Sequence, residues 1–165
     1  MPLDATQTVA ALALAAHPEG GWYRELFRSP RRITRADGAE RSALTLIWFL
    51  LAPGQVSAWH RVRGADETWH WVDGGALELL VVERDGRAWR TVLGARDAGH
   101  ASSAIVPADA WQAARPLGDE AALVQCACAV APGFDFADFD LWRDVPDAHA
   151  ALATAPEDWN SLMLW

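Results

Sequence analysis

The chain has few of the residues that mark several common classes of protein. Only two of its 165 residues are cysteines, Cys126 and Cys128. A strand would place them next but one on the same face, which is poor geometry for a disulfide. Two thiols are also too few for a tetrahedral zinc site. We expect both to be small, reduced core residues, which fits a cytoplasmic protein.

Positive charge is scarce as well. There are 14 Lys and Arg against 22 Asp and Glu, a formal net charge of −8, which argues against non-specific binding to nucleic acid or to anionic membranes. The apolar run at residues 9–16 is too short to cross a bilayer. A signal peptide would require basic residues before the apolar run, but no Lys or Arg precedes Arg24. We expect no nucleic-acid partner and no membrane partner.

What the sequence does contain is a series of short apolar segments typical of strands. They are separated by Gly and Pro, and Asp85-Gly86 predicts a type I′ hairpin turn between two of them. The absence of helix-length segments between these strands disfavours a doubly wound α/β fold. The pattern therefore predicts an all-β sandwich or barrel. The strands fall at residues 44–51, 76–83, 102–107, 110–115 and 121–130.

Helices are expected only at the two ends of the chain. Asp4 or Thr6 can cap a helix that runs to about Ala16, and Pro146 can start a short helix over Asp147–Ala153. The length suits one domain, residues 1–165, with its core at about residues 20–142.

A candidate site lies in two adjacent segments of the middle region. Strand alternation puts His60 on one face with Ala58 and Val62, which suggests that this face points inward. An inward histidine needs a polar partner, because burial without one is costly. If the chain returns as a hairpin, Glu67 faces the same interior. Glu67 could then orient the imidazole, share a metal with it, or raise its pKa.

The spacing of these residues resembles the cupin superfamily. Gly54, His60, Glu67 and Gly74 match the first cupin motif, and residues 107–112 match the second. The segments HPEGGWYRE (17–25), VPADAWQAA (106–114) and APGFDFADF (131–139) closely resemble the cupin-5 branch, a domain of unknown function. The resemblance covers about residues 9–142. It implies a single double-stranded β-helix, or jelly-roll barrel, with short terminal helices, and a homodimer. It supplies no reaction.

Two departures from the cupin motifs bear on metal binding. Metal-binding cupins carry a second histidine where this chain has Val62, and the histidine of the second motif is replaced by Gln112, with Asp109 in place of a glycine. His60, Glu67 and Gln112 remain as the ligands of any metal, which is fewer good donors than transition-metal sites use. We therefore expect no cofactor, with a divalent metal as the minor alternative. His70 would join only if a bulge turned it inward.

The metal-free alternative is general acid–base chemistry. His60 would act as the base and Glu67 would tune it, while Tyr23, the only tyrosine, would be the acid. Some cupins are metal-free keto-sugar epimerases that use a histidine and a tyrosine in this way, and the chain is similar to them. Arg24 could bind a carboxylate or phosphate, or form a surface pair with Glu25 or Glu19. The residues expected to bind the ligand are Arg24, Glu25, Trp69, His70, Trp111 and Gln112.

The sequence thus predicts a cupin-type barrel with a polar pocket for a small carbohydrate-like or anionic ligand. An isomerase- or epimerase-like activity is one hypothesis for the function of this pocket. A non-catalytic ligand-binding or storage-type cupin and a metal-dependent cupin enzyme are the alternatives.

Three further features are expected to be of structural origin. His17 lies between predicted secondary-structure elements, where the usual polarity of loops explains the presence of a histidine. The aspartates of residues 135–140 alternate with phenylalanines, which predicts a solvated edge with the phenyl rings docked on the barrel or on a partner subunit. The basic segment at residues 28–41 is expected either to cover the mouth of the pocket or to be a solvated loop.

Overall fold

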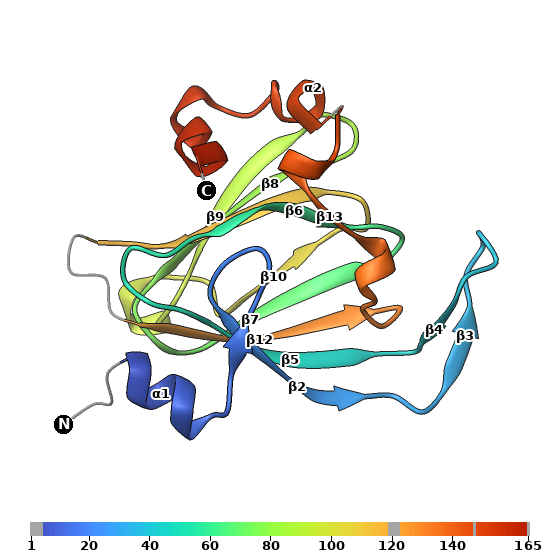
Figure 1. Cartoon of the computed structure of the whole chain (residues 1–165). Coiled ribbons are helices and arrows are strands. Elements are labelled where there is room, and N and C mark those ends of the chain that lie inside the picture. The colour runs from blue at the N-terminus through green and yellow to red at the C-terminus, as the bar shows by residue number, and fades with distance from the viewer. Residues whose placement is uncertain (1–4, 119–122, 147, 165) are drawn as a thin grey trace.

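The computed structural model describes residues 5–118, 123–146 and 148–164. Two antiparallel sheets face each other across the core (Figure 1). The first has the order β1 (Ala15–Ala16), β2 (Trp22–Arg28), β5 (Thr45–Leu51), β12 (Val124–Ala131), β7 (Asp66–Gly74) and β10 (Ser103–Val106). The second has the order β13 (Phe139–Leu141), β6 (Ser57–Val62), β11 (Trp111–Pro116), β8 (Leu77–Val82) and β9 (Ala88–Leu93). The expected all-β jelly roll is confirmed.

The inner faces of the two sheets form the main core. Strand β12 shows the alternation that a half-buried strand requires: Cys126 and Cys128 are buried while their neighbours are partly exposed. Cys128 lies between Ile47 on β5 and Trp69 on β7, and both thiols are free. The two cysteines are therefore core residues, as the sequence predicted.

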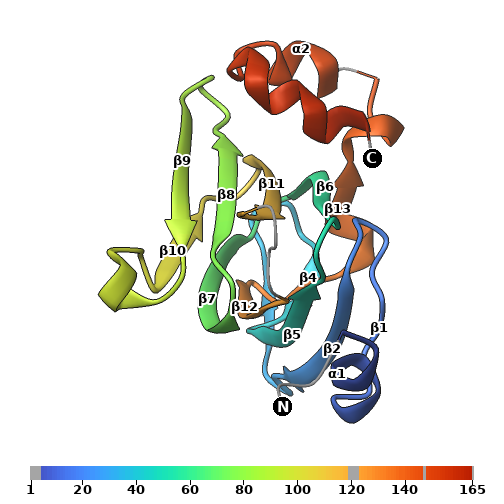
Figure 2. The same cartoon turned by 90° about the vertical axis from the view of Figure 1, so that its left-hand side faces the viewer.

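The outer face of the second sheet is also buried. The C-terminal segment, with η3 (Trp142–Asp144), α2 (Ala148–Leu152) and η4 (Glu157–Leu164), lies across it (Figures 1 and 2). Trp59 on β6 stacks on Trp159, with ring centroids 6.2 Å apart. Strand β8 is consequently buried along its whole length, which explains why it is apolar except for Glu78, whose carboxylate pairs with Arg115.

A short hairpin extends beyond the barrel. It consists of β3 (Arg32–Thr34) and β4 (Glu40–Ser42), and it projects at the right of Figure 1. The buried carboxylate of Asp138, in η2 (Phe136–Asp138), holds its base: Arg35 Nη1 donates to it at 2.9 Å and Arg41 Nε at 2.7 Å. The basic segment is therefore an anchored hairpin, and Asp138 is buried instead of lying on a solvated edge.

Two local expectations differ from the structure. Helix α1 spans only Ala5–Ala11, because the chain turns at Ala13, with φ 51°, and Ala15–Ala16 pairs with β2. In the β8–β9 turn only Gly86 has a positive φ, 87°. Its N–H donates to the carbonyl of Glu83, so the loop has three residues and is not a type I′ turn. Asp4 and Asp147, the expected helix starts, lie outside the described residues.

The remaining helical turn, η1 (Arg96–Ala98), connects β9 to β10. Within the described parts of the chain, no helix is long and apolar enough to cross a membrane.

Candidate active site

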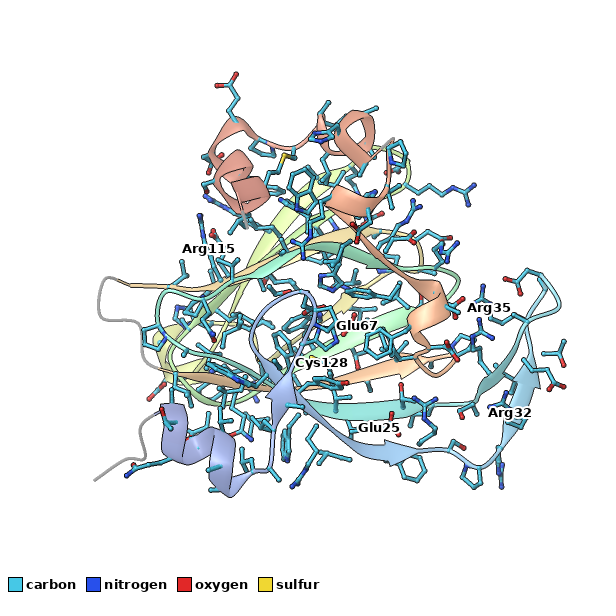
Figure 3. All side chains as sticks on the ribbon, in the orientation of Figure 1. Glu25, Arg32, Arg35, Glu67, Arg115 and Cys128 are labelled. Atoms are coloured by element: carbon cyan, nitrogen blue, oxygen red, sulfur yellow. The ribbon has the colours of Figure 1, made fainter. Side chains whose placement is uncertain are left out.

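A cavity of about 450 Å³ opens between the sheets, within the size range of small-molecule sites. Residues of seven strands line it, β1, β2, β5, β6, β7, β12 and β13, together with the segments before β2 and before β13. Figure 3 shows Glu67 and Cys128 near the centre of the barrel, where both reach this space. The lining residues on which the chemistry depends are His17, Glu19, Tyr23, His60, Glu67 and Trp69.

Glu67 is held by a chain of buried hydrogen bonds. The indole Nε1 of Trp69 donates to Gln112 Oε1 at 2.9 Å, and Gln112 Nε2 donates to Glu67 Oε2 at 2.7 Å. Because an indole N–H can only donate, it fixes the orientation of the glutamine amide. The other carboxylate oxygen, Oε1, has no hydrogen bond within the described residues, so it is available to a ligand.

The environment of Glu67 makes its carboxyl group titrate near neutrality. Burial raises its pKa to about 7, and the nearby Glu19 carboxyl adds to the rise. His60 and the Gln112 hydrogen bond act in the opposite direction. At neutral pH the group therefore exists in both protonation states, which suits a residue that accepts and returns a proton.

A second polar cluster centres on Glu19. Its Oε2 lies 3.2 Å from His60 Nε2 and 3.3 Å from His17 Nδ1. Ser57 Oγ donates to the other oxygen, Oε1, at 2.8 Å. The polar partner that the inward His60 requires is therefore Glu19, in direct contact, whereas Glu67, the partner expected from the sequence, acts on His60 through its charge.

Hydrogen-bond geometry indicates where the protons of this cluster lie. His60 Nδ1 is 2.8 Å from the carbonyl oxygen of Ala58. A carbonyl only accepts, so Nδ1 carries a hydrogen and a neutral ring has a bare Nε2 facing Glu19. One proton must then lie between Nε2 and Oε2. Burial raises the pKa of Glu19 and lowers the pKa of His60, which favours a neutral carboxylic acid beside a neutral imidazole.

A tight turn places Glu19. Gly20 and Gly21 have φ of 110° and 70°, and a Cβ on Gly20 would lie 2.2 Å from the carbonyl oxygen of Val56. This close approach brings the carbonyl of Glu19 to the N–H of Ala58 on β6, at 2.8 Å. His17 and Glu19 were not predicted from the sequence as site residues. Their signal was the segment HPEGGWYRE, in which a Gly-Gly pair follows them.

Aromatic side chains surround His17 at the edge of the cavity. The ring of Tyr23 meets it edge-on with centroids 4.7 Å apart, and Phe139 does so at 5.6 Å. Phe136 stacks on it at 6.0 Å and remains half exposed. The phenylalanines expected to dock on the barrel do so here, and they form part of the cavity wall.

The structure brings most of the predicted site residues together. Tyr23, Arg24, Glu25, His60, Glu67 and Trp69 line the cavity, and Gln112 binds Glu67 from behind. Neither surface pair suggested for Arg24 forms: Glu25 pairs with Arg28 at 2.7 Å, and Glu19 faces the histidines.

Two predicted ligand-binding residues, His70 and Trp111, do not line this cavity. His70 is exposed and its Nε2 contacts Thr68 Oγ1 at 3.0 Å. Trp111 packs beneath the C-terminal segment, with the Arg61 guanidinium 4.8 Å from its ring centroid. The outward orientation of both residues follows from strand alternation, because their chain neighbours Trp69 and Gln112 face inward.

The donor set does not fit the metal ion that the cupin fold can hold. Both amide atoms of Gln112 and both ring nitrogens of His60 are already engaged within the protein. Val62 offers no donor. Among the described residues, no three His, Cys, Asp or Glu side chains are grouped to hold a metal. The arrangement suits an organic ligand better than a cation.

Comparison with known proteins relates the chain to one family. The family profile Cupin_5, described as Cupin superfamily (DUF985), matches residues 6–142. A hypothetical protein from Leishmania major is 30% identical, with a TM-score of 0.79 over 92% of this chain and 97% of that chain. A protein from Shewanella oneidensis is 28% identical, with a TM-score of 0.78 over 98% and 96%.

More distant structures share the fold alone. A variant of oxalate decarboxylase from Bacillus subtilis is 18% identical, with a TM-score of 0.55 over 89% of this chain and 36% of that chain. No curated protein matches the sequence.

Proposed function

The chain belongs to the Cupin_5 family of the cupin superfamily, and from this premise we propose that it binds a small oxo compound in its cavity and moves a proton on that compound, as isomerases and epimerases do. One observation carries the proposal. A buried carboxyl group whose pKa is raised to about 7, Glu67, faces the same cavity as a tyrosine hydroxyl. These are the two groups that enolisation requires.

Glu67 takes the part of the base in this proposal. The sequence had favoured His60, but Nδ1 of His60 donates to Ala58 and Nε2 faces Glu19. Neither nitrogen is free to take a proton from a ligand. Oε1 of Glu67 is free among the described residues, and the hydrogen bond from Gln112 to Oε2 holds the carboxylate in place. His60 then shapes the field around Glu67 as a positioning residue.

Tyr23 takes the part of the acid. Its hydroxyl makes no hydrogen bond within the described residues, and its ring lines the cavity in edge-on contact with the ring of His17. Glu67 would remove the proton from the carbon next to the carbonyl, and the C–H electron pair would form a C=C bond. The carbonyl π electrons would move to oxygen, to which Tyr23 donates. Return of the proton to the other face of the same carbon, with the oxygen-bound proton going back to Tyr23, gives the epimer. If that carbon carries a hydroxyl, protonation of the former carbonyl carbon and transfer of the hydroxyl proton to Tyr23 give the isomer.

Hydrogen–deuterium exchange on carbon tests the proposal without knowledge of the natural substrate. The protein would be incubated in D₂O with a panel of ketoses and aryl alkyl ketones. Loss of the α-C–H signal would be followed by proton NMR. We expect the wild type to exchange at least one compound, and Glu67→Gln and Tyr23→Phe to slow the exchange about a hundredfold or more.

Residues outside the cavity supply matched controls. Glu40→Gln makes the glutamate-to-glutamine change at an exposed residue, and His70→Ala removes an exposed ring, so both should leave exchange unaltered. Exchange that persists in both cavity variants would refute the assignment of roles. Saturable binding with no exchange of any compound would favour the alternative, a ligand-binding cupin without catalysis.

A further inference from the structure

The walls of the cavity are mostly apolar, which limits the kind of ligand it can hold. Ile47 and Phe49 come from β5, Val62 from β6 and Val130 from β12, and all four line the space. Val62 is 4% and Val130 5% exposed, and Phe134 packs against both. The buried carboxyl and imidazole groups of the lining belong to the Glu67 and Glu19 clusters, whereas Glu25, Arg28 and Asp135, which also line the cavity, are exposed.

A ligand with hydroxyl groups all round its surface would be poorly matched to these walls. On entering the cavity, each hydroxyl loses its water, and a hydroxyl that faces valine, isoleucine or phenylalanine finds no partner. An apolar body gains contact and loses no hydrogen bond there. The composition of the walls therefore disfavours a free sugar, the ligand class that the sequence had suggested.

The charges around the cavity disfavour an anionic ligand in the same way. Arg28 is neutralised by Glu25 through two hydrogen bonds, of 2.7 and 3.0 Å. Arg24 also contributes to the lining and has no ion pair among the described residues, but it alternates with Tyr23 and Glu25 on β2, so its side chain projects from the face opposite theirs. A carboxylate or phosphate in the interior would therefore meet the Glu67 carboxyl group with no unpaired arginine on the cavity face of β2 to offset the charge.

We propose that the ligand is an uncharged compound with an aromatic or alicyclic body and a single oxo group. The oxo group lies at Glu67 and Tyr23, and the body lies against Phe49, Val62 and the rings near His17. The assignment of an oxo group rests on the proposed function, while the apolar body rests on the cavity walls alone.

Three probe compounds separate the parts of this inference. 4-Phenyl-2-butanone carries both an apolar body and an oxo group, butylbenzene lacks the oxo group, and D-fructose carries a keto group with hydroxyls throughout. Binding of each would be measured by ligand-observed saturation-transfer NMR and by titration calorimetry. We expect 4-phenyl-2-butanone to bind most tightly, butylbenzene to bind about tenfold more weakly, and fructose to show no saturable binding.

A matched pair of substitutions places the binding in the cavity. Val62→Thr keeps the shape of the side chain and puts a hydroxyl into the wall, while Val72→Thr makes the same change at a residue that is 42% exposed. Val62→Thr should weaken 4-phenyl-2-butanone about tenfold, and Val72→Thr should not change its affinity. Equal affinities in the two variants, or fructose binding more tightly than the aryl ketone, would overturn the inference.

The outcome distinguishes this inference from the proposed function. Binding of the aryl ketone that is sensitive to Val62→Thr, without carbon exchange, would support the ligand class and remove the catalytic role. Exchange confined to ketoses would support catalysis and refute the ligand class.

Discussion

At the scale of single residues, Glu67 links the chemistry of the cavity to the stability of the fold. Its pKa rises from the ordinary 4.5 to about 7 on folding. The folded state therefore holds this proton more tightly than the unfolded chain does. The stability associated with it is fully present below pH 4.5 and is lost as the pH rises to about 7.

Replacement of Glu67 by glutamine should remove this dependence. Glutamine has nearly the same shape as glutamate and no charge to bury. The difference in the free energy of unfolding, Glu67→Gln minus wild type, should therefore be about 2 kcal/mol larger at pH 8 than at pH 5. Urea unfolding at the two pH values measures the difference. The exposed Glu40→Gln is the control and should show no such change. A wild-type–variant difference that is the same at both pH values would contradict the raised pKa.

Gln112 should act on the reaction through Glu67. Its hydrogen bond favours the carboxylate form and lowers the pKa of Glu67. Since the proposed base must be ionised, exchange activity should rise with pH through about 7 in the wild type. Gln112→Leu should shift this rise to higher pH, as measured by the pH profile of α-C–H exchange. A lower maximum with an unshifted profile would indicate a purely structural role.

At the scale of elements, the turn at Gly20-Gly21 is the feature on which the Glu19 cluster depends. A side chain at Gly20 would collide with the backbone carbonyl of Val56, the residue that precedes β6. Gly20→Ala should therefore cost about 4 kcal/mol or more, because the backbone itself must move. Chemical unfolding of the variant measures this cost.

A second glycine separates this clash from simple backbone strain. Gly99 also has a positive φ, 80°, but nothing lies within 4 Å of a Cβ there. Gly99→Ala should lose only about 1 kcal/mol. Similar losses in both variants would show that contact with Val56 is not the cause.

Strand alternation made part of this site predictable. It placed His60, Glu67 and Trp69 toward one interior, and the structure agrees. The same rule turns His70 and Trp111 away from the cavity once Trp69 and Gln112 face inward, so a reason present in the sequence already separates them from this site. Asp109 also obeys a local rule. It has a φ of 67°, which aspartate tolerates better than most residues, and its carboxylate accepts the N–H of Gly64 at 3.0 Å.

The Glu19 cluster was beyond such rules. Its contacts join residues about 40 positions apart, such as Glu19 and Ser57, through a turn whose direction no periodicity encodes. The ion pairs of Asp138 with Arg35 and Arg41 span about 100 positions and were hidden for the same reason. Long-range polar contacts of this kind become visible only when the fold is known.

At the scale of the whole molecule, the C-terminal segment is part of the core. Trp159 is 3% exposed and packs with Trp59, Trp111 and Leu152 on the outer face of the second sheet. Trp159→Ala should cost about 3–5 kcal/mol in the free energy of unfolding. The affinity for 4-phenyl-2-butanone should not change, because the cavity lies on the opposite face of that sheet.

An exposed residue serves as the control for this prediction. Ile105 is 63% exposed on β10, and Ile105→Ala should change the stability by about 0.5 kcal/mol at most. A loss in Trp159→Ala no larger than this would show that the segment covers the sheet without stabilising it.

The homodimer and the cytoplasmic location stay predictions.

The hydrogen bond from the Ala58 N–H to the Glu19 carbonyl has a kinetic consequence. The amide lies on a strand whose neighbours are buried, so solvent reaches it only when the turn at residues 17–21 lifts away. Such an excursion removes His17 and Glu19 from the cavity while the two sheets stay closed. The deuterium-exchange rate of the Ala58 amide would therefore report how often the turn opens without global unfolding. A tightly bound ligand should lower this exchange rate.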